Sequence, residues 1–121
     1  MAKKEILIVD DDKVVLRMLE TILLRAGYSV IPLSLGREAI KIAIERSPAL
    51  IILDIMMPDM DGGDLAHIIK NDSRTNHIPI IFLSSLVTNR EEQSSSKKQG
   101  LYFLAKPIER DKLLRQIDQI L

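Results

Sequence analysis

The sequence predicts a single α/β domain over residues 1–121, built on a doubly wound, five-stranded parallel sheet of strand order 2-1-3-4-5 with five flanking helices. Three observations support this fold class. Five short apolar runs are almost uninterrupted, as in strands that are buried on both faces. Segments with the apolar spacing of helices alternate with these runs. The length of 121 residues suits one domain with one core.

The predicted strands are aliphatic, because aromatic residues make up only 3% of the chain. In order, they cover residues 6–9 (ILIV), 28–33 (YSVIPL), 49–53 (ALIIL), 78–83 (IPIIFL) and 101–105 (LYFLA). Pro32 lies inside the second run, and proline cannot donate a hydrogen bond to a neighbouring strand. The order 2-1-3-4-5 puts this strand at an edge of the sheet, where the missing donor is tolerated.

Apolar residues three and four positions apart predict the helices. Four segments show this spacing: Val15, Leu16, Leu19, Ile22 and Leu23; Ala39, Ile40, Ala43 and Ile44; Leu65, Ile68 and Ile69; and Leu113, Leu114, Ile117, Ile120 and Leu121. Gly27 and the pair Ser47-Pro48 mark the ends of the first two, and Pro107 precedes the last. Residues 88–99 include three consecutive serines and little periodicity, so the fourth helix is predicted to be the weakest.

The composition excludes several functional classes. Lys plus Arg and Asp plus Glu number 17 each, so the net charge gives no reason to expect direct binding to nucleic acid or to a membrane surface. The absence of cysteine excludes disulfides, thiolate zinc sites and thiol catalysis. The apolar run at residues 6–9 is too short for a signal peptide or a membrane span. We therefore expect a cytoplasmic protein.

Polar and charged residues follow the predicted strands directly. They are Asp10, Asp11 and Asp12 after the first strand, Asp54 after the third, Ser84 and Ser85 after the fourth, and Lys106 after the fifth. In an open parallel sheet, ligands bind beyond the carboxyl ends of the strands, where the strand order reverses. Because the first and third strands are neighbours in the predicted order, Asp10, Asp11 and Asp54 are expected to converge there.

Such a cluster of carboxylates needs neutralising charge. Two unit charges about 4 Å apart repel by about 4 kcal/mol at an effective dielectric constant near 20, and a domain is stable by only about 5–15 kcal/mol. Mg²⁺ suits one or two carboxylates with water and phosphate oxygens, and Mn²⁺ is the alternative ion. Lys106 supplies a second, fixed cation. Asp12 is instead predicted to cap the first helix.

Four motifs, ILIVDD, LIILDIMMPDMDG, IPIIFLSS and FLAKP, stand in an order and spacing that resemble the receiver domain of two-component response regulators, including the chemotaxis regulators, over the whole chain. The resemblance implies a flavodoxin-like fold in which Asp54 is the phosphoacceptor. It also implies an Mg²⁺ site formed by Asp10, Asp11, Asp54 and the backbone carbonyl of Met56.

The resemblance further implies a switch. Ser84 and Lys106 match the residues that bind the phosphoryl group, and Ser84 and Phe103 match the pair that changes the surface of helix four, strand five and helix five. The implied phosphoryl donor is a sensor histidine kinase or a phosphotransfer protein. The implied targets are a downstream protein or a linked output domain, and the same surface is a possible homodimer contact.

The lifetime of the phosphoryl group also follows from side chains. Met56, two residues after the acceptor, and Leu86, two residues after Ser84, are apolar and cannot orient an attacking water. We therefore predict slow self-dephosphorylation and no turnover enzyme activity, with a Met56→Asn, Leu86→Glu double variant losing phosphate faster.

Three alternatives to this switch remain. A receiver-like scaffold would bind partners without phosphorylation. A phosphohydrolase would use Asp54 in turnover, but no second acid stands two residues later, where phosphatases with an aspartate nucleophile have their general acid. A flavin-binding electron carrier would need a hydroxyl- and glycine-rich loop after the first strand, where this chain has three acids.

Overall fold

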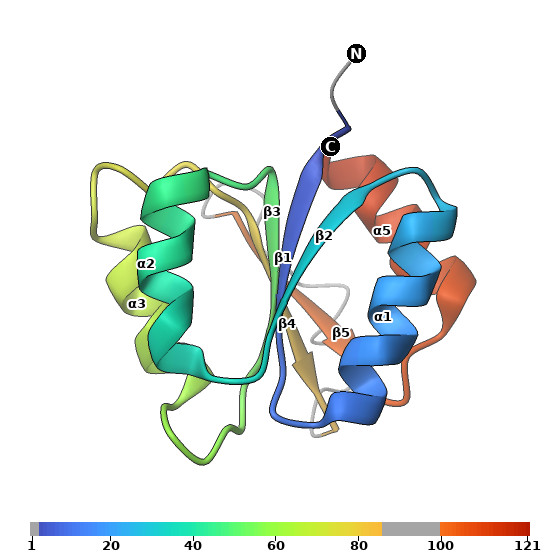
Figure 1. The fold of residues 1–121 in the computed structure, drawn as a ribbon, viewed down its shortest axis with the longest axis horizontal. Coiled ribbons are helices and arrows are strands. Elements are labelled where there is room, and N and C mark those ends of the chain that lie inside the picture. Colours follow the sequence, from blue (N-terminus) through green and yellow to red (C-terminus); the bar gives the residue numbers. More distant parts are fainter. Residues whose placement is uncertain (1–2, 86–99) are drawn as a thin grey trace.

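The computed structural model describes residues 3–85 and 100–121, which form a parallel sheet with helices on both faces (Figure 1). The strands are β1 (Glu5–Val9), β2 (Ser29–Leu33), β3 (Leu50–Asp54), β4 (Ile80–Ser84) and β5 (Leu101–Ala105). The helices within the described ranges are α1 (Lys13–Arg25), α2 (Gly36–Arg46), α3 (Gly62–Lys70) and α5 (Arg110–Ile120). The predicted helix at residues 88–99 lies outside the described residues.

The strand order is β2-β1-β3-β4-β5, so the predicted order is confirmed. β1 pairs with both β2 and β3, and Ile8 lies opposite Pro32 on one side and Ile52 on the other. Pro32 therefore stands on an edge strand, as its missing N–H requires.

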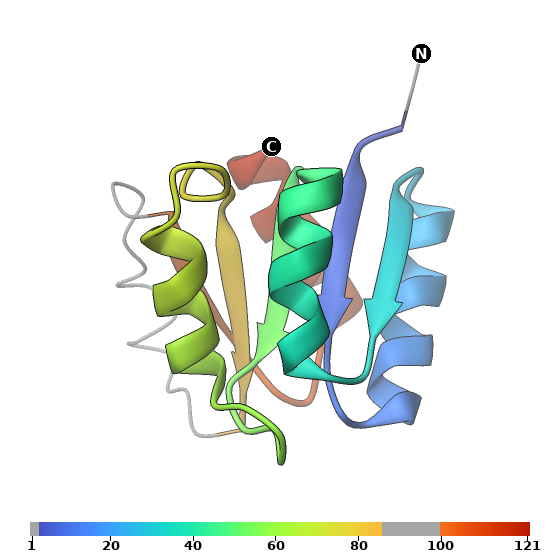
Figure 2. The ribbon, with the colours of Figure 1, turned by 60° about the vertical axis from the view of Figure 1, so that its left-hand side comes forward.

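Two apolar cores explain why the strands are almost continuously hydrophobic. Leu7, Ile51 and other buried residues of one sheet face pack beneath α2 and α3. Ile6 and Ile52 point to the opposite face, which α1 and α5 cover. Figure 1 shows the two helix pairs on either side of the sheet, and Figure 2 shows α2 and α3 running against the strand direction. Both faces are buried, so alternate residues of a strand contribute to different cores.

The ends of the elements differ slightly from the prediction. Asp54 and Ser84 are the last residues of β3 and β4, not the first residues after them. β2 and β4 begin later than expected because turns use the preceding residues. The Tyr28 N–H donates to the Leu23 carbonyl, and the Ile78 N–H donates to that of Thr75.

The predicted ends of α1 are confirmed. The Asp12 side chain accepts hydrogen bonds from the N–H groups of Val14 and Val15 at 2.9 and 3.4 Å. Gly27 follows the helix with a φ of 97°, in the left-handed region that favours glycine. No helix among residues 3–85 and 100–121 combines the length and apolar character needed to cross a bilayer.

Candidate functional site

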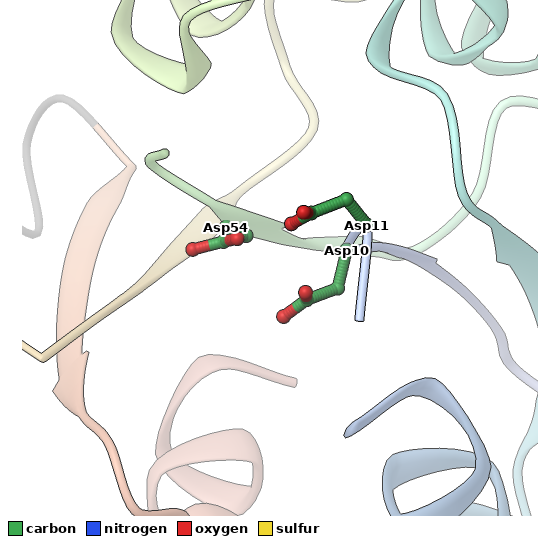
Figure 3. A group of neighbouring side chains, drawn as sticks. All are labelled: Asp10, Asp11 and Asp54. Carbon is green, nitrogen blue, oxygen red and sulfur yellow. The ribbon is translucent and has the colours of Figure 1, made fainter. Parts of the chain in front are cut away.

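Three carboxylates meet at the carboxyl ends of β1 and β3. Asp10, Asp11 and Asp54 each offer an oxygen, and these oxygens all lie within 4.8 Å of one another. Figure 3 shows the three side chains extending to the same side of the two strand ends. The predicted convergence is therefore confirmed, and its cause is the adjacency of β1 and β3 in the sheet.

Asp10 is fully buried, whereas Asp11 is exposed. Oδ1 of Asp10 accepts a hydrogen bond from the Asp12 N–H at 2.9 Å. Oδ2 has no hydrogen bond of good geometry within the described part of the chain, but it forms an ion pair with Nζ of Lys106 at 3.0 Å. A buried carboxylate oxygen with a single contact is available to a further cation.

Lys106 reaches this cluster from the other side of β4. It follows β5, and its backbone N–H donates to the Ser84 carbonyl at 3.0 Å. Its Nζ lies 3.0 Å from Asp10 and 3.4 Å from Asp54. Burial opposes the charged ammonium, but the close contact with Asp10 and the negative charges of both aspartates outweigh this effect and raise the pKa of Lys106.

The environment of Asp54 disfavours its ionised form. Burial and the charge of Asp10 raise the pKa of Asp54 to about 6, against the opposing effects of Lys106 and of the Met56 backbone N–H, which donates to the carboxylate. Asp54 is only 5% exposed, so this cost cannot be relieved by water. A cation at the cluster would restore the charged form.

A pocket of about 140 Å³ adjoins Asp54. It is lined by Asp54, Met56, Ser84, Ser85 and Lys106. Pockets for drug-sized ligands and cofactors are usually about 300–1,000 Å³, so this one suits a small group such as a phosphoryl group and is too small for a flavin. It brings three of the predicted site residues, Asp54, Ser84 and Lys106, around one space.

The loop that carries Met56 approaches the site closely because of Gly62. A Cβ at this position would lie 2.4 Å from the carbonyl oxygen of Asp54. The Gly62 N–H also donates to the Ile55 carbonyl at 2.8 Å, which closes the loop. Only glycine permits this contact between the start of α3 and the end of β3.

Phe103 has an aromatic neighbour that sequence reasoning did not identify. Its ring stacks on that of Phe82, with centroids 5.2 Å apart and an interplanar angle of 29°. The two residues lie opposite each other on β5 and β4, and Phe82 precedes Ser84 by two residues. The sequence shows that Phe82 lies two residues before Ser84. It does not show the register of β4 and β5, which places Phe82 opposite Phe103.

The donor set fits Mg²⁺. Carboxylate oxygens are the ligands that hard divalent cations prefer, and the buried Oδ2 of Asp10 accepts no hydrogen bond of good geometry from the described residues. The carbonyl of Met56 lies in the loop directly beyond Asp54. Leu86, singled out for the phosphoryl lifetime, lies outside the described residues.

A family model of the response regulator receiver domain matches residues 6–118. This chain belongs to that family. It is 34% identical to the transcriptional regulatory protein GltR of Pseudomonas aeruginosa over 98% of this chain and 49% of that protein. The chemotaxis protein CheY4 of Vibrio cholerae has the same fold, with a TM-score of 0.85 and 30% identity over 99% of this receiver chain and 100% of that one.

A third similar structure is the receiver domain of the sensor histidine kinase PA1611 from Pseudomonas aeruginosa, which has a magnesium ion coordinated in its active-site cleft. It has a TM-score of 0.84 and 28% identity, with 98% of this chain and 97% of that chain covered. The receiver chain spans about half or less of the length of several curated relatives that it matches. The match to the family model over residues 6–118 confirms the resemblance to the receiver family.

Proposed function

We propose that Asp54 accepts a phosphoryl group from a phosphohistidine of a sensor histidine kinase or a phosphotransfer protein. One observation carries this proposal: Nζ of Lys106 lies within 3.4 Å of Asp54 beside a small pocket that also includes Ser84. This arrangement puts a nucleophile, a cation and a hydroxyl around a space of the right size for one phosphoryl group.

In this reaction, a carboxylate oxygen of Asp54 attacks the phosphorus atom. The new O–P bond forms as the P–N bond to the donor histidine breaks, and the electron pair stays on the histidine nitrogen, which takes up a proton. Lys106 and the Ser84 hydroxyl bind the equatorial oxygens, whose charge must be stabilised in the transition state. The product is an acyl phosphate on Asp54.

Asp10, Asp11 and Asp54 would hold Mg²⁺ together with the Met56 backbone carbonyl, and Mn²⁺ could replace it. When bound, the ion supplies positive charge that offsets the carboxylates and the transferring phosphoryl group. The chain itself contributes the remaining charge, since Lys106 is anchored by its backbone hydrogen bond to Ser84.

The proposed output is a change of the surface that includes β5 and α5; the predicted fourth helix, residues 88–99, lies outside the described residues. The stacked pair Phe82 and Phe103 links Ser84 to β5, because Phe82 lies two residues before it on the same strand. A hydrogen bond from Ser84 to the phosphoryl group would therefore shift the end of β4, which carries Phe82, and so alter its stacking on Phe103 of β5. A protein target, a linked output domain or a second copy of the chain would read this cytoplasmic switch.

Exposed apolar side chains support a protein partner at the site. Val14, in the first turn of α1, is 77% exposed, and Met56 is 67% exposed. Both follow strands that end at the acceptor edge of the sheet. A phosphohistidine donor approaching Asp54 would cover them. A receiver-like scaffold that binds partners without phosphorylation would use the same residues, so the chemistry has to be tested directly.

The test is the intact mass of the chain after incubation with a small acyl-phosphate donor and Mg²⁺. We expect one phosphate adduct on the wild type and none on Asp54→Asn. Equal labelling of both proteins would move the acceptor elsewhere. No labelling of the wild type would favour the scaffold.

The same assay measures how long the phosphoryl group persists. Met56→Asn places an amide beside the acceptor, where it can orient a water molecule, and we expect phosphate to be lost several times faster than from the wild type. Met60→Asn, a control in the same loop, should leave the rate unchanged. Equal rates for Met56→Asn and the wild type would show that the apolar side chain does not protect the acyl phosphate.

A further inference from the structure

The start of α2 is capped from a distant part of the chain. The residue before the helix, Leu35, has no side chain that could accept a hydrogen bond. Asp59, in the loop between β3 and α3, takes its place. Oδ1 of Asp59 accepts from the Gly36 N–H at 3.2 Å, and Oδ2 accepts from the Arg37 N–H at 3.1 Å. The hydrogen bond from the Arg37 N–H, and to a lesser degree that from the Gly36 N–H, holds the pKa of Asp59 below its usual value.

The capping loop is the one that carries Met56. Its two ends are fixed close to the site: the Ile55 N–H donates to the Leu83 carbonyl at 3.2 Å, and the Gly62 N–H donates to that of Ile55 at 2.8 Å. Between these ends, the Met56 N–H donates to the Asp54 carboxylate, and Asp61 accepts from the first turn of α3. The described hydrogen bonds that hold the middle of the loop against α2 are those made by Asp59. The orientation of the peptide at Met56 therefore depends in part on how firmly this middle part is held.

Packing confirms that the loop and α2 are fitted to each other. Met57 is buried, and its Cε would lie 3.1 Å from a Cβ added to Gly36. Cβ of Met60 would lie 3.3 Å from the same point. A glycine at position 36 thus lets the loop come close enough for Asp59 to reach the helix N-terminus, whose N–H groups have no partner within the helix.

We propose that Asp59 is a positioning residue for the metal site: by capping α2 across the chain, it holds the loop so that the Met56 carbonyl faces Asp10, Asp11 and Asp54. This inference rests on the proposed function, in which that carbonyl is an Mg²⁺ ligand. Asp59 itself touches neither the ion nor the phosphoryl group. Its effect on Mg²⁺ affinity passes through the loop.

The experiment titrates Mg²⁺ alone into the full chain and follows backbone amide shifts by NMR. Three variants are compared with the wild type. Asp59→Ala removes both hydrogen bonds. Asp59→Asn has the same net charge as Asp59→Ala but keeps one oxygen acceptor. Asp61→Ala, the matched control, also removes one carboxylate and two backbone hydrogen bonds, which Asp61 accepts locally from Gly63 and Asp64 at 2.7 and 3.3 Å.

We expect Asp59→Ala to raise the Kd for Mg²⁺ by about three- to tenfold, below the roughly 10- to 100-fold typical of groups that directly hold metal ligands. Asp59→Asn and Asp61→Ala should stay within about twofold of the wild type. Amide exchange at Gly36 and Arg37 should quicken in Asp59→Ala. If Asp59→Ala is too unstable to study, Asp59→Gln tests the same point, because its longer side chain carries the acceptor to the wrong place without removing it.

Two results would overturn the proposal. One is unchanged Mg²⁺ affinity in Asp59→Ala despite faster exchange at Gly36 and Arg37, which would make the cap purely structural. The other is an equal loss of affinity in Asp61→Ala, which would assign the effect to charge or general stability. A wild type that binds Mg²⁺ but is not labelled by the acyl phosphate would instead overturn the proposed function, and the Mg²⁺ comparison would still decide the role of Asp59.

Discussion

Two partly buried lysines lie at opposite ends of the sheet and experience opposite environments. Lys106, at the carboxyl end, forms ion pairs with two aspartates, and its pKa is raised even though burial opposes its charge. Lys70 ends α3 at the amino end of the strands, where its Nζ donates to the carbonyls of Ile78 and Asn76 at 2.6 and 3.3 Å. Burial lowers the pKa of Lys70. The two neutral carbonyls accept hydrogen bonds from the ammonium group, but they do not make up for the hydration that the charged form loses on burial.

This difference separates a structural charge from a functional one. Lys70 fastens the connection between α3 and β4, which is also held by a hydrogen bond from Oγ1 of Thr75 to the Ile69 carbonyl at 2.7 Å. Lys106 instead belongs to a cluster whose charges do not cancel. It offsets only part of the effect of burial and of the charge of Asp10, so the pKa of Asp54 remains raised. A set of buried charges that is incompletely balanced is expected where a further ion or a charged group binds.

The largest predicted effect compares Lys106→Met with Lys70→Met. Removing Lys106 leaves Asp10 buried and without its counter-ion, so we expect the free energy of unfolding to fall by about 2–4 kcal/mol. Lys70→Met removes hydrogen bonds to carbonyls but also the cost of burying a charge, so a change of about 1 kcal/mol or less is expected. Urea unfolding at pH 7 in buffer free of divalent cations measures both.

Equal losses in the two lysine variants would contradict the comparison, because they would show that the carboxylates add nothing beyond ordinary hydrogen bonding. Lys106→Arg serves as the control for charge. It should recover most of the stability lost in Lys106→Met, although its planar head group fits the site differently.

The carboxylate half of the same cluster gives the second prediction. Because the pKa of Asp54 is raised to about 6 in the folded chain, this residue is more protonated in the folded than in the unfolded protein between pH 3.8 and about 6. The unfavourable effect of ionised Asp54 is therefore fully present above about pH 6 and disappears as the pH falls. Asp54→Asn should stabilise the metal-free protein at pH 7 by about 1–3 kcal/mol.

The check is urea unfolding of Asp54→Asn and the wild type at pH 7 and pH 5. The stability gap between them should narrow at the lower pH, where Asp54 is protonated. Asp64→Asn, which neutralises an exposed acid on α3, should change stability by no more than about 0.5 kcal/mol at either pH. A destabilised Asp54→Asn protein would mean that the charge of Asp54 is already compensated without a metal ion.

The sequence was sufficient to predict the contacts that depend on strand order alone. Asp10 and Asp54 follow from two apolar runs that end in acids, because neighbouring parallel strands end at the same edge. Pro32 similarly indicated the edge strand. These inferences need no knowledge of side-chain packing.

Contacts that depend on register or on the path of a loop could not be predicted. The pairing of Phe82 with Phe103 requires the register of β4 and β5, and the cap from Asp59 to α2 joins segments more than 20 residues apart. Lys70 reads as one more surface lysine of an amphipathic helix until the turn after α3 brings the Ile78 carbonyl to it. In each case, tertiary structure supplies a partner that local spacing does not specify.

The smallest predicted effect is a difference in titration between the two lysines, measured by NMR of their ε-methylene groups in metal-free buffer. The pKa of Lys70 should lie below 10.5 and that of Lys106 above it. As the pH approaches 10.5 from below, Lys70 is more protonated in the unfolded chain than in the folded one, so this residue makes stability rise with pH. Lys106 behaves in the opposite way: the stability that it contributes is lost as the pH rises through its folded pKa. The signals are assigned by their absence in the Lys70→Met and Lys106→Met variants. Two midpoints on the same side of 10.5 would contradict the assignment of one lysine to the fold and the other to the site.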